Sequence, residues 1–325
     1  MRPFSLAAGV NCRGYSLGLQ RVMVDFGADL SFARAAEKVK EHYQIDVNSS
    51  AIRARTEGHG RLMALESEMN VRMPAAGVRE LIAELDGSFV PIVEIAEGTG
   101  DKRKRRKLKW EEAKLGVVGV MGSRRRRYSA TMRGAEEAGR QWRSAAIEMG
   151  AGCNTHLHCL GDGAGWIVGQ VKAQFGAAAS YLVDFYHVSE YVAQAGQAFA
   201  GAGTKQWLRE QQEKLKENRV GEVLSELARH REGEAKSEEE TAIRKCERYL
   251  GERVPYLDYA GAIKKGLPIG SGEVESGHRT VIQPRLKLSG AWWTEENAEK
   301  MLAMRVVRAN GEWEAYWKGQ RQAHA

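Results

Sequence analysis

A series of short apolar segments between residues 79 and 183 constrains the fold of this chain more than any other feature. Four of them have the length and composition of β-strands and lie at 81–85, 89–95, 115–121 and 127–132. Further along, helices and strands are expected to alternate: helix 134–149, strand 156–160, helix 166–175 and strand 181–183. Strands in a run followed by this alternation predict an α/β fold in which helices flank a mixed sheet.

The segment before the predicted sheet is expected to be helical over 16–70. Apolar residues recur there at helical spacing, a turn follows at 44–47, and Asn48 can cap a second helix. This pattern fits a helix-turn-helix, in which Arg53 and Arg55 would contact phosphates or base edges of DNA. A plain helical hairpin explains the same residues, and the two interpretations have equal weight.

Two further helical regions are expected after residue 186. Residues 187–265 are rich in mixed charges and predict a helical block with an acidic loop at 232–240. An amphipathic helix is expected at 295–309, where Thr294 is a suitable N-cap. The predicted organisation is therefore a helical region at 1–78, a core at 79–186 and 266–312, the helical block at 187–265, and a C-terminal tail at 313–325.

Positive charge is clustered rather than spread along the chain. The formal net charge is +7 and the isoelectric point is about 9.2. Two runs contribute candidates for phosphate contacts: Lys102, Arg103, Lys104, Arg105, Arg106, Arg124, Arg125, Arg126 and Arg127. Clustered cations bind polyanions by releasing condensed counterions, so the combination favours a nucleic acid partner. For either run alone, a solvated loop is the alternative.

Three carboxylates occupy positions that suit metal-dependent phosphoryl chemistry. Asp86 ends the first apolar run, Asp162 closely follows the strand expected at 156–160, and Glu275 follows a glycine-rich turn where a helix is expected to open. Hard oxygen ligands of this kind hold Mg²⁺, and two such ions about 3.5–4 Å apart can stabilise both the attacking and the leaving oxygen of a displacement. In a basic protein, the three residues predict a metal-dependent nuclease or strand transferase, although any one alone could be an ordinary exposed acid.

The spacing of the carboxylates indicates where the helical block is inserted. Asp86 and Asp162 are 76 residues apart (162 − 86), which suits three strands, a helix and a fourth strand. Asp162 and Glu275 are 113 residues apart (275 − 162), far more than one strand and one helix require. The surplus is the block at 187–265, so the predicted core is interrupted between its second and third carboxylates.

Other classes of site and location find less support in the sequence. The four cysteines are too few and too scattered for a disulfide scaffold. The segment 153–159 contains two cysteines and two histidines, but on a strand these side chains would point to opposite faces, unlike those of a zinc knuckle. No apolar stretch approaches the roughly 18 residues that span a bilayer. The chain is therefore expected to be a cytoplasmic, nucleoid-associated protein that does not contact a membrane.

Five motifs together resemble a known family. Four of them surround acidic residues: Leu85-Asp86-Gly87-Ser88, Gly161-Asp162-Gly163-Ala164, Asp184-Phe185-Tyr186-His187 and Pro268-Ile-Gly-Ser-Gly-Glu-Val-Glu275-Ser276. The fifth and most specific is Arg285-Leu-Lys287-Leu-Ser-Gly290-Ala-Trp292-Trp293. They resemble bacterial insertion-sequence DDE transposases of the ISKra4 type, related to the Mutator-like group, over about residues 16–310. The resemblance implies a ribonuclease-H-like core with a helical insertion, in which Asp86, Asp162 and Glu275 bind two Mg²⁺ ions, with Mn²⁺ as a substitute.

The third carboxylate and its neighbours are assigned through this resemblance. The family pattern of a hydrophobic residue followed by Glu-Ser selects Glu275 over Glu273, and on one helix the two would lie roughly 200° apart. His278 and Arg279 would lie beside Glu275, where they could meet a phosphate.

Supporting residues follow from the remaining motifs. Asp184 could orient the imidazole of His187 near the metal site, or it could simply cap a helix while the histidine packs. Trp292 and Trp293 could stack on unpaired bases, although packing in the core is the simpler interpretation. Arg285 and Lys287 of the same motif are further candidates for DNA contacts.

The expected function is therefore cleavage and transfer of DNA strands in the transposition of an insertion sequence. Partners would be the transposon ends and target DNA, with a homo-oligomer assembled on paired ends. The alternatives are a ribonuclease-H-like nuclease that does not join strands, and a catalytically silent repressor derived from a transposase. Members of the resembled family have more sequence before the helix-turn-helix, so truncation of the N-terminal region is also expected.

Overall fold

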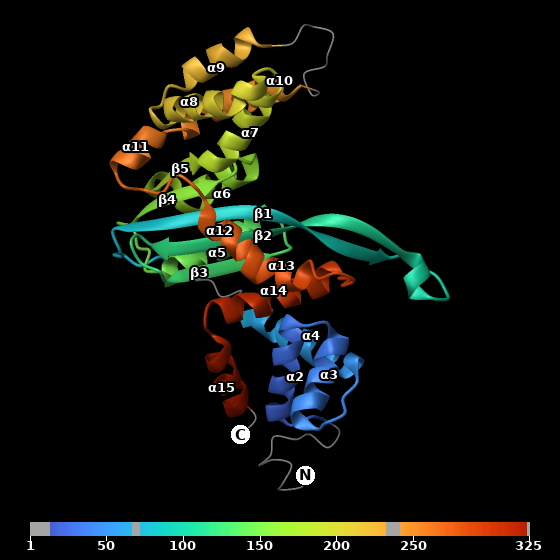
Figure 1. The fold of residues 1–325 in the computed structure, drawn as a ribbon. Coiled ribbons are helices and arrows are strands. Elements are labelled where there is room, and N and C mark those ends of the chain that lie inside the picture. Colours follow the sequence, from blue (N-terminus) through green and yellow to red (C-terminus); the bar gives the residue numbers. More distant parts are fainter. Residues whose placement is uncertain (1–13, 67–71, 232–240, 324–325) are drawn as a thin grey trace.

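The computed structural model describes residues 14–66, 72–231 and 241–323 of the chain. Its centre is a five-stranded mixed sheet in the order β3-β2-β1-β4-β5 (Figure 1). The strands are β1 (Glu80–Ile95), β2 (Arg106–Val120), β3 (Arg126–Thr131), β4 (His156–Gly161) and β5 (Ala179–Val183). β1, β2 and β3 are antiparallel neighbours, whereas β4 runs parallel to β1 and β5 parallel to β4. The predicted α/β fold with a mixed sheet is confirmed.

β1 is one strand of 16 residues, so the expectation of two separate strands at 81–85 and 89–95 was wrong. Its pairing with β2 continues without a break past Asp86 to Ile95, which lies opposite Arg106. Because ladder hydrogen bonds from β2 continue along it, the Asp-Gly-Ser sequence after residue 85 forms no turn.

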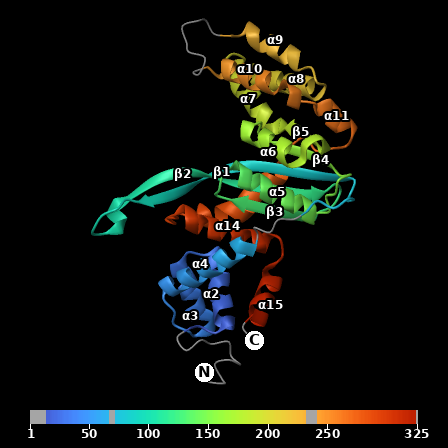
Figure 2. The ribbon, with the colours of Figure 1, turned by 180° about the vertical axis from the view of Figure 1, so that it is seen from behind.

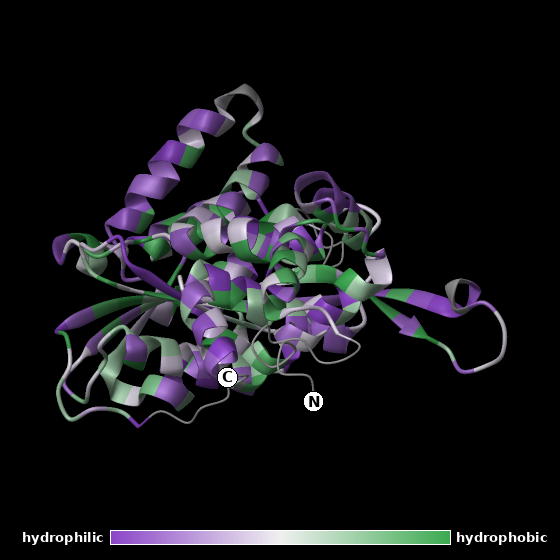
Figure 3. Ribbon diagram, turned by 90° about the horizontal axis from the view of Figure 1, so that it is seen from below, coloured by the Kyte–Doolittle hydropathy of each residue, from purple (hydrophilic) through white to green (hydrophobic). Residues whose placement is uncertain are grey.

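The outer halves of β1 and β2 form a hairpin. β4 pairs with β1 only as far as Glu84 and Leu160, and β3 pairs with β2 only between Lys114 and Gly119. Beyond these points the two strands continue as a ribbon, with η1 (Lys102–Arg105) near its tip. Figure 3 shows this ribbon projecting from the body, with hydrophilic residues prominent along it. The sequence predicts a basic loop over residues 98–109, but the strand resumes earlier than this, because Arg106 begins β2.

One face of the sheet is covered by α5 (Ala135–Glu148) and α6 (Gly165–Phe175), which lie in front of it in Figure 2. Alternate residues of a strand point to opposite faces, and Leu81, Ala83 and Leu85 pack on this side against the buried ring of Trp142. The short η2 (Gly176–Ala178) leads from α6 into β5.

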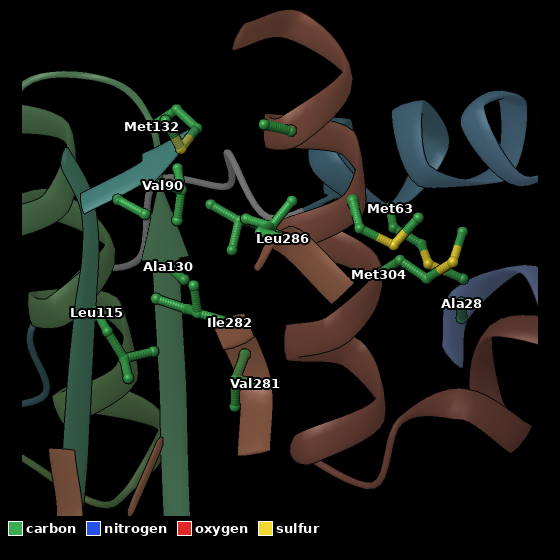
Figure 4. Packing of buried hydrophobic residues seen from close by; sticks show 14 of the residues in the cluster. Ala28, Met63, Val90, Leu115, Ala130, Met132, Val281, Ile282, Leu286 and Met304 are labelled. Carbon is green, nitrogen blue, oxygen red and sulfur yellow. The ribbon is translucent and has the colours of Figure 1, made fainter. Parts of the chain in front are cut away.

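The opposite face of the sheet is crossed by the segment after the helical block. This segment comprises α12 (Gly272–Gly277), the π-helical turn η5 (His278–Ile282), α13 (Gln283–Leu286) and α14 (Glu295–Ala309). Figure 4 shows the packing, in which Val281, Ile282 and Leu286 meet Leu115 and Ala130 of the sheet. α14 has the predicted bounds, and the predicted cap is confirmed because Thr294 accepts a hydrogen bond from Asn297 N.

The predicted helical block follows β5 and has its own hydrophobic core. It contains α7 (Phe185–Gln197), η3 (Gly201–Gly203), α8 (Thr204–Lys216), α9 (Val220–Arg229), α10 (Ala242–Arg253), η4 (Val254–Tyr256) and α11 (Tyr259–Lys264). Val192, Leu227 and Leu250 are buried in it, in one cluster with Leu160 and Leu182 of the sheet. The block therefore rests on the β4–β5 side of the sheet. The acidic loop expected at 232–240 lies outside the described residues.

The N-terminal region is helical, as expected, and packs on α14 rather than on the helical block. Its helices are α2 (Leu17–Asp29), α3 (Phe32–Tyr43) and α4 (Ser49–Glu66). The predicted cap is confirmed, because Asn48 Oδ1 accepts a hydrogen bond from Ala51 N at 2.7 Å. The C-terminal stretch is not a tail, since α15 (Trp313–Ala323) buries Trp317 against His59 of α4. Its aromatic residues supply the apolar face that this packing requires.

Candidate active site

Asp86 lies at the point where β4 stops pairing with β1. The last paired residues, Glu84 and Leu160, are 76 positions apart (160 − 84). Asp86 and Asp162 have the same offset (162 − 86), so Asp162, the first residue after β4, is level with Asp86. Level residues of parallel strands lie on the same side of a sheet, and neighbouring strands are about 4.8 Å apart. The structure therefore brings together the two aspartates that were predicted as metal ligands.

The electrostatics of the two aspartates agree with this proximity. Burial raises the pKa of Asp162, and the negative charge of the Asp86 carboxylate raises it further. Each carboxylate is also held by a backbone N–H: Ala164 N donates to Asp162 Oδ1 and Gly87 N donates to Asp86 Oδ1, both at 2.8 Å. A nearby cation would stabilise two such neighbouring charges.

Helix α12 passes over Asp86 on the same face of the sheet. Asp86 is paired with Leu115 across β1 and β2, and paired residues of antiparallel strands share a face. A Cβ on Gly277 would lie 2.7 Å from Leu115 Cδ2, which shows how closely the helix approaches the sheet. The next residue, His278, is buried, and its Nε2 donates to Asp86 Oδ2 at 3.1 Å. The structure thus places His278 in contact with Asp86, whereas its predicted contact with a phosphate stays a prediction.

Glu273 and Glu275 have different surroundings. Glu273 accepts a hydrogen bond from the Arg126 guanidinium at 2.6 Å, so its charge is already compensated. Glu275 is exposed, and its carboxylate has no hydrogen-bond or ion-pair partner among the residues that the structure describes. Glu275 precedes His278 by three positions, which places both on the same side of the helix. Arg279 is exposed next to them.

The three carboxylates are of the ligand type that a hard cation prefers, but they do not surround a single metal position in this structure. Asp86 and Asp162 offer neighbouring carboxylate oxygens, the ligand type that Mg²⁺ and Mn²⁺ take. Within residues 14–66, 72–231 and 241–323, no three acidic, histidine or cysteine side chains are grouped closely enough to hold a metal ion. Glu275 would have to turn towards the aspartates to complete the set.

Asp184 continues the row of aspartates but has a different environment. Gly161 pairs with Val183, so Asp184 is level with Asp162 on the next strand. Its Oδ1 accepts hydrogen bonds from the backbone N–H groups of Tyr186 and His187, at 2.6 and 2.9 Å, and thereby caps α7. The capping interpretation of Asp184 therefore describes its contacts, since the carboxylate bonds to the backbone of His187 and not to its imidazole.

The helical block reaches the loop that contains Asp162. Tyr249 of α10 donates its hydroxyl to the carbonyl oxygen of Asp162 at 2.6 Å, and Arg253 Nε donates to Gly163 O at 3.1 Å. The His187 ring lies beside Tyr249, with 5.8 Å between ring centroids. Sequence reasoning missed Tyr249 and Arg253, because charged helical segments contain no signal for a contact so far away in the chain.

Sequence reasoning also missed Glu84. It is 3% exposed although it is acidic, and it lies on the same face of β1 as Asp86. Burial raises its pKa to about 7. A signal was present, because Glu84 interrupts the apolar run 81–85 and an acid inside a buried strand needs a partner.

The basic runs are only partly available for DNA. Arg105 is half-buried and donates to Ala96 O at 2.6 Å, whereas Lys104 and Arg106 are exposed on the hairpin. The side chains of Lys102 and Arg103 lie outside the described part of the chain. In the second run, Arg124 and Arg125 are exposed, but Arg126 and Arg127 form ion pairs that join elements of the fold: Arg126 with Glu273, and Arg127 with Glu148 and Glu312.

The two tryptophans of the fifth motif have opposite environments. Trp293 is 3% exposed, and its carbonyl oxygen accepts from Val93 N at 2.7 Å, so it is a core residue. Trp292 is 45% exposed, and the guanidinium of Arg106 lies 3.4 Å from the centre of its ring. Lys287 is exposed and donates to Ser88 Oγ at 2.8 Å.

The prediction that Arg285 contacts DNA conflicts with its position in the structure. Arg285 is 2% exposed, its guanidinium lies 4.6 and 4.8 Å from the ring centres of Phe32 and Trp293, and Nε donates to Gly27 O at 3.1 Å. Burial lowers its pKa to about 10. Its cationic group holds α2 and α3 against the core and cannot reach a phosphate from there.

A cavity of about 450 Å³ brings together three of the remaining candidates. It lies between α4, the hairpin and the segment before α14, and its lining includes Arg53, Arg106 and Trp292. Arg53 is exposed, with Glu57 at 4.0 Å, and Arg55 lies 5.9 Å from the ring centre of Tyr15. Basic residues from the N-terminal helices and from the hairpin thus share one surface with an exposed aromatic ring.

Comparison with known proteins identifies the family of this chain. None of the described helices is both long and apolar enough to cross a membrane. No curated protein matches the chain. A family model described as "Uncharacterised protein family (UPF0236)" matches residues 13–322, from before α2 to the last turn of α15. The chain therefore belongs to the uncharacterised protein family UPF0236.

Proposed function

We propose that this protein is a metal-dependent enzyme that cleaves and joins DNA strands, a transposase of the DDE class resembling the ISKra4 type. The observation that supports this most strongly is the level placement of Asp86 and Asp162 at the end of β4, beneath α12, which contains Glu275 and is followed directly by His278. Two adjacent carboxylates with a third on a nearby helix form a donor set suited to phosphoryl transfer.

The sheet supports the same proposal. The mixed sheet, with three antiparallel strands extended by two parallel ones, is compatible with the ribonuclease-H-like core that the resemblance implies. The helical block lies between β5 and α12, so the chain leaves the sheet after Asp184 and returns over Asp86. This insertion accounts for the long separation between Asp162 and Glu275, as the resemblance implies.

The chemistry is divided among a few residues. Asp86, Asp162 and Glu275 would hold Mg²⁺, which when bound supplies a Lewis acid for activating water or a 3′-hydroxyl and for stabilising the leaving oxygen. His278 orients Asp86 through its Nε2 hydrogen bond. Tyr249 and Arg253 fix the loop of Asp162 from the side of the helical block. Arg279, exposed beside Glu275, is available to a phosphate of the substrate.

DNA and a second copy of the chain are the proposed partners. Lys104 and Arg106 are exposed cations on the hairpin, Arg125 is exposed in the turn before β3 at the other end of β2, and Arg53 and Arg55 are exposed on α4. Together they could bind the phosphates of transposon ends and target DNA. Because transposon ends must be brought together before joining, a homo-oligomer on DNA is expected.

The test is an assay with DNA duplexes that carry the ends flanking this gene, together with a circular target and Mg²⁺. We expect cleaved ends and joined products from the wild type, and neither from Asp86→Ala, Asp162→Ala or Glu275→Ala, while DNA binding persists. Glu273→Ala is the matched control, since Glu273 is paired with Arg126. Cleavage by Glu275→Ala would refute its assignment. Cleavage without joining would identify a nuclease, and salt-sensitive binding without nicking would identify a repressor.

A further inference from the structure

Glu84 is a buried acid that the proposed chemistry does not use. Its side chain lies two residues before Asp86 on the same face of β1, beneath the start of α12. Burying a carboxylate is costly unless a specific partner compensates it. Its partner here is a backbone group, since Val274 N donates to Glu84 Oε2 at 2.7 Å.

The start of α12 lacks its usual cap. The first N–H groups of a helix have no partner within the helix, and an N-cap serine commonly accepts one of them. Ser271 is the N-cap of α12, but its side chain makes no capping hydrogen bond. The Ser271 hydroxyl donates instead to Asp184 Oδ2, and Ser271 N donates to the same oxygen at 2.5 Å. The N–H of Val274 is therefore left for Glu84.

Two carboxylates from adjacent regions of the sheet thus hold the start of α12. Asp184, after β5, binds Ser271, and Glu84, in β1, binds Val274. A negative charge at this end of a helix is also favoured by the helix dipole. One turn later the same helix presents Glu275, and then His278 with its hydrogen bond to Asp86.

We propose that Glu84 is a positioning residue of the active site. By accepting the Val274 N–H it fixes α12 over β1, so that His278 meets Asp86 and Glu275 can turn towards Asp86 and Asp162. The effect of Glu84 on catalysis rests on the proposed function, whereas its hydrogen bond to α12 is independent of that function.

The test compares two buried replacements of similar size. Glu84→Gln keeps an oxygen that can accept the Val274 N–H, and Glu84→Met keeps the chain length without an acceptor. Glu80→Met is the control, since Glu80 begins the same strand but forms a surface pair with His156. Amide hydrogen exchange of the metal-free protein measures the hold on α12. Strand cleavage at increasing Mg²⁺ concentration measures the effect on the site.

In Glu84→Met we expect the amides of Val274 and the following turn to exchange about tenfold faster, as loss of one such hydrogen bond allows. The amides of β1 and β4 should keep their rates, and cleavage should fall and need more Mg²⁺. Glu84→Gln should resemble the wild type in both measurements. The proposal is overturned if the α12 amides of Glu84→Met exchange at the wild-type rate, or if those of Glu84→Gln exchange as fast as those of Glu84→Met. It is also overturned if the α12 amides exchange faster in Glu84→Met without any change in cleavage. If the wild type does not cleave DNA, the proposed function fails, and exchange alone decides whether Glu84 holds α12.

Discussion

Asp162, the first residue after β4, is level with Asp86 of the neighbouring parallel strand β1, which continues to Ile95. Beyond Asp86, the edge of β1 that pairs with β4 no longer has a strand beside it in the described part of the chain. The next backbone contact along this edge is with the segment around Trp293. The pair therefore lies at a notch in the sheet, where one strand stops beside another that continues. α12 lies over this notch and is fixed to it through His278.

His278 should affect the chemistry through Asp86. Its Nε2 donates to Asp86, whereas its Nδ1 is buried without a hydrogen-bond partner in the described structure. Loss of a group that orients a ligand typically reduces activity by about 10–100-fold. We expect His278→Ala to reduce Mg²⁺-dependent cleavage to this extent, and His278→Gln, which can still donate, to recover part of it. His156→Ala, at a surface pair with Glu80, is the control. Equal activity of all three variants would contradict the role.

Glu84 should make stability depend on pH. Burial raises its pKa to about 7, from 4.5 in the unfolded chain, and the charges of Glu273 and Asp184 add to this. Between these values the folded state binds more protons than the unfolded state, so this contribution is complete below pH 4.5 and is lost as pH rises through 7. The loss should amount to roughly 3 kcal/mol.

The measurement is the free energy of unfolding in urea at several pH values between 5 and 8, without divalent metal. Other buried acids, such as Glu299, also titrate, so the useful quantity is the difference between wild type and Glu84→Gln. The free energy of unfolding of the wild type should decrease relative to that of Glu84→Gln as pH rises. Parallel curves for the two proteins would mean that Glu84 is not the titrating group.

Replacement of two glycines of α4 by alanine should change the stability of the protein in opposite directions. A Cβ on Gly60 would lie 2.6 Å from the carbonyl oxygen of Lys300 in α14, whereas a Cβ on Gly58 would meet nothing within 4 Å. Gly60→Ala should therefore force the helices apart and cost about 1–3 kcal/mol. Gly58→Ala should stabilise by up to about 1 kcal/mol through helix propensity. Thermal unfolding of the two variants is the measurement, and a stabilised Gly60→Ala would show that α4 and α14 are less close than described.

Local signals in the sequence were sufficient for some elements and not for others. α14 has the predicted bounds because both signals are local: Thr294 caps its first turn, and the apolar stripe runs along the helix itself. β1 was divided in two because Asp86-Gly87-Ser88 has the composition of a turn, whereas the hydrogen bonds that keep it extended come from β2. Pairing of this kind depends on distant residues, which no local pattern contains.

The candidate site shows the same limit. The motifs selected Asp86 and Asp162, but the strand order and register that bring the two level are properties of the whole sheet and of no single motif. The same reasoning treated Arg285 as a surface cation, but it is buried against the rings of Phe32 and Trp293. A charged side chain becomes internal only when segments far apart in the chain supply its partners, and Phe32 precedes the sheet whereas Arg285 follows it. The hydrogen bond from Val274 N to Glu84 was not predicted for the same reason.

The cations of the hairpin should contribute affinity for DNA without sequence preference. Arg106 lies on the exposed ring of Trp292, and Lys104 is exposed near the tip of the ribbon. Replacing Lys102, Arg103, Lys104, Arg105 and Arg106 by Ala should weaken binding to the element's ends and to random DNA alike. Each lost phosphate contact should lower the salt slope of binding by about 0.9. Unchanged affinity and slope would mean that the run is a solvated loop.

The cations of α4 and of the core should behave differently from those of the hairpin. Arg53 and Arg55 lie on the helix expected to reach base edges, so Arg53→Ala with Arg55→Ala should reduce the discrimination between specific and random DNA. Arg285 is buried, and Arg285→Ala would remove its hydrogen bond to Gly27 O and its contacts with both rings. We expect that variant to lower the midpoint of thermal unfolding while leaving the salt slope of the folded protein unchanged. Binding titrations at several salt concentrations, combined with thermal unfolding, separate the three classes. A reduced slope for folded Arg285→Ala would instead identify Arg285 as a phosphate contact and require its side chain to leave the core.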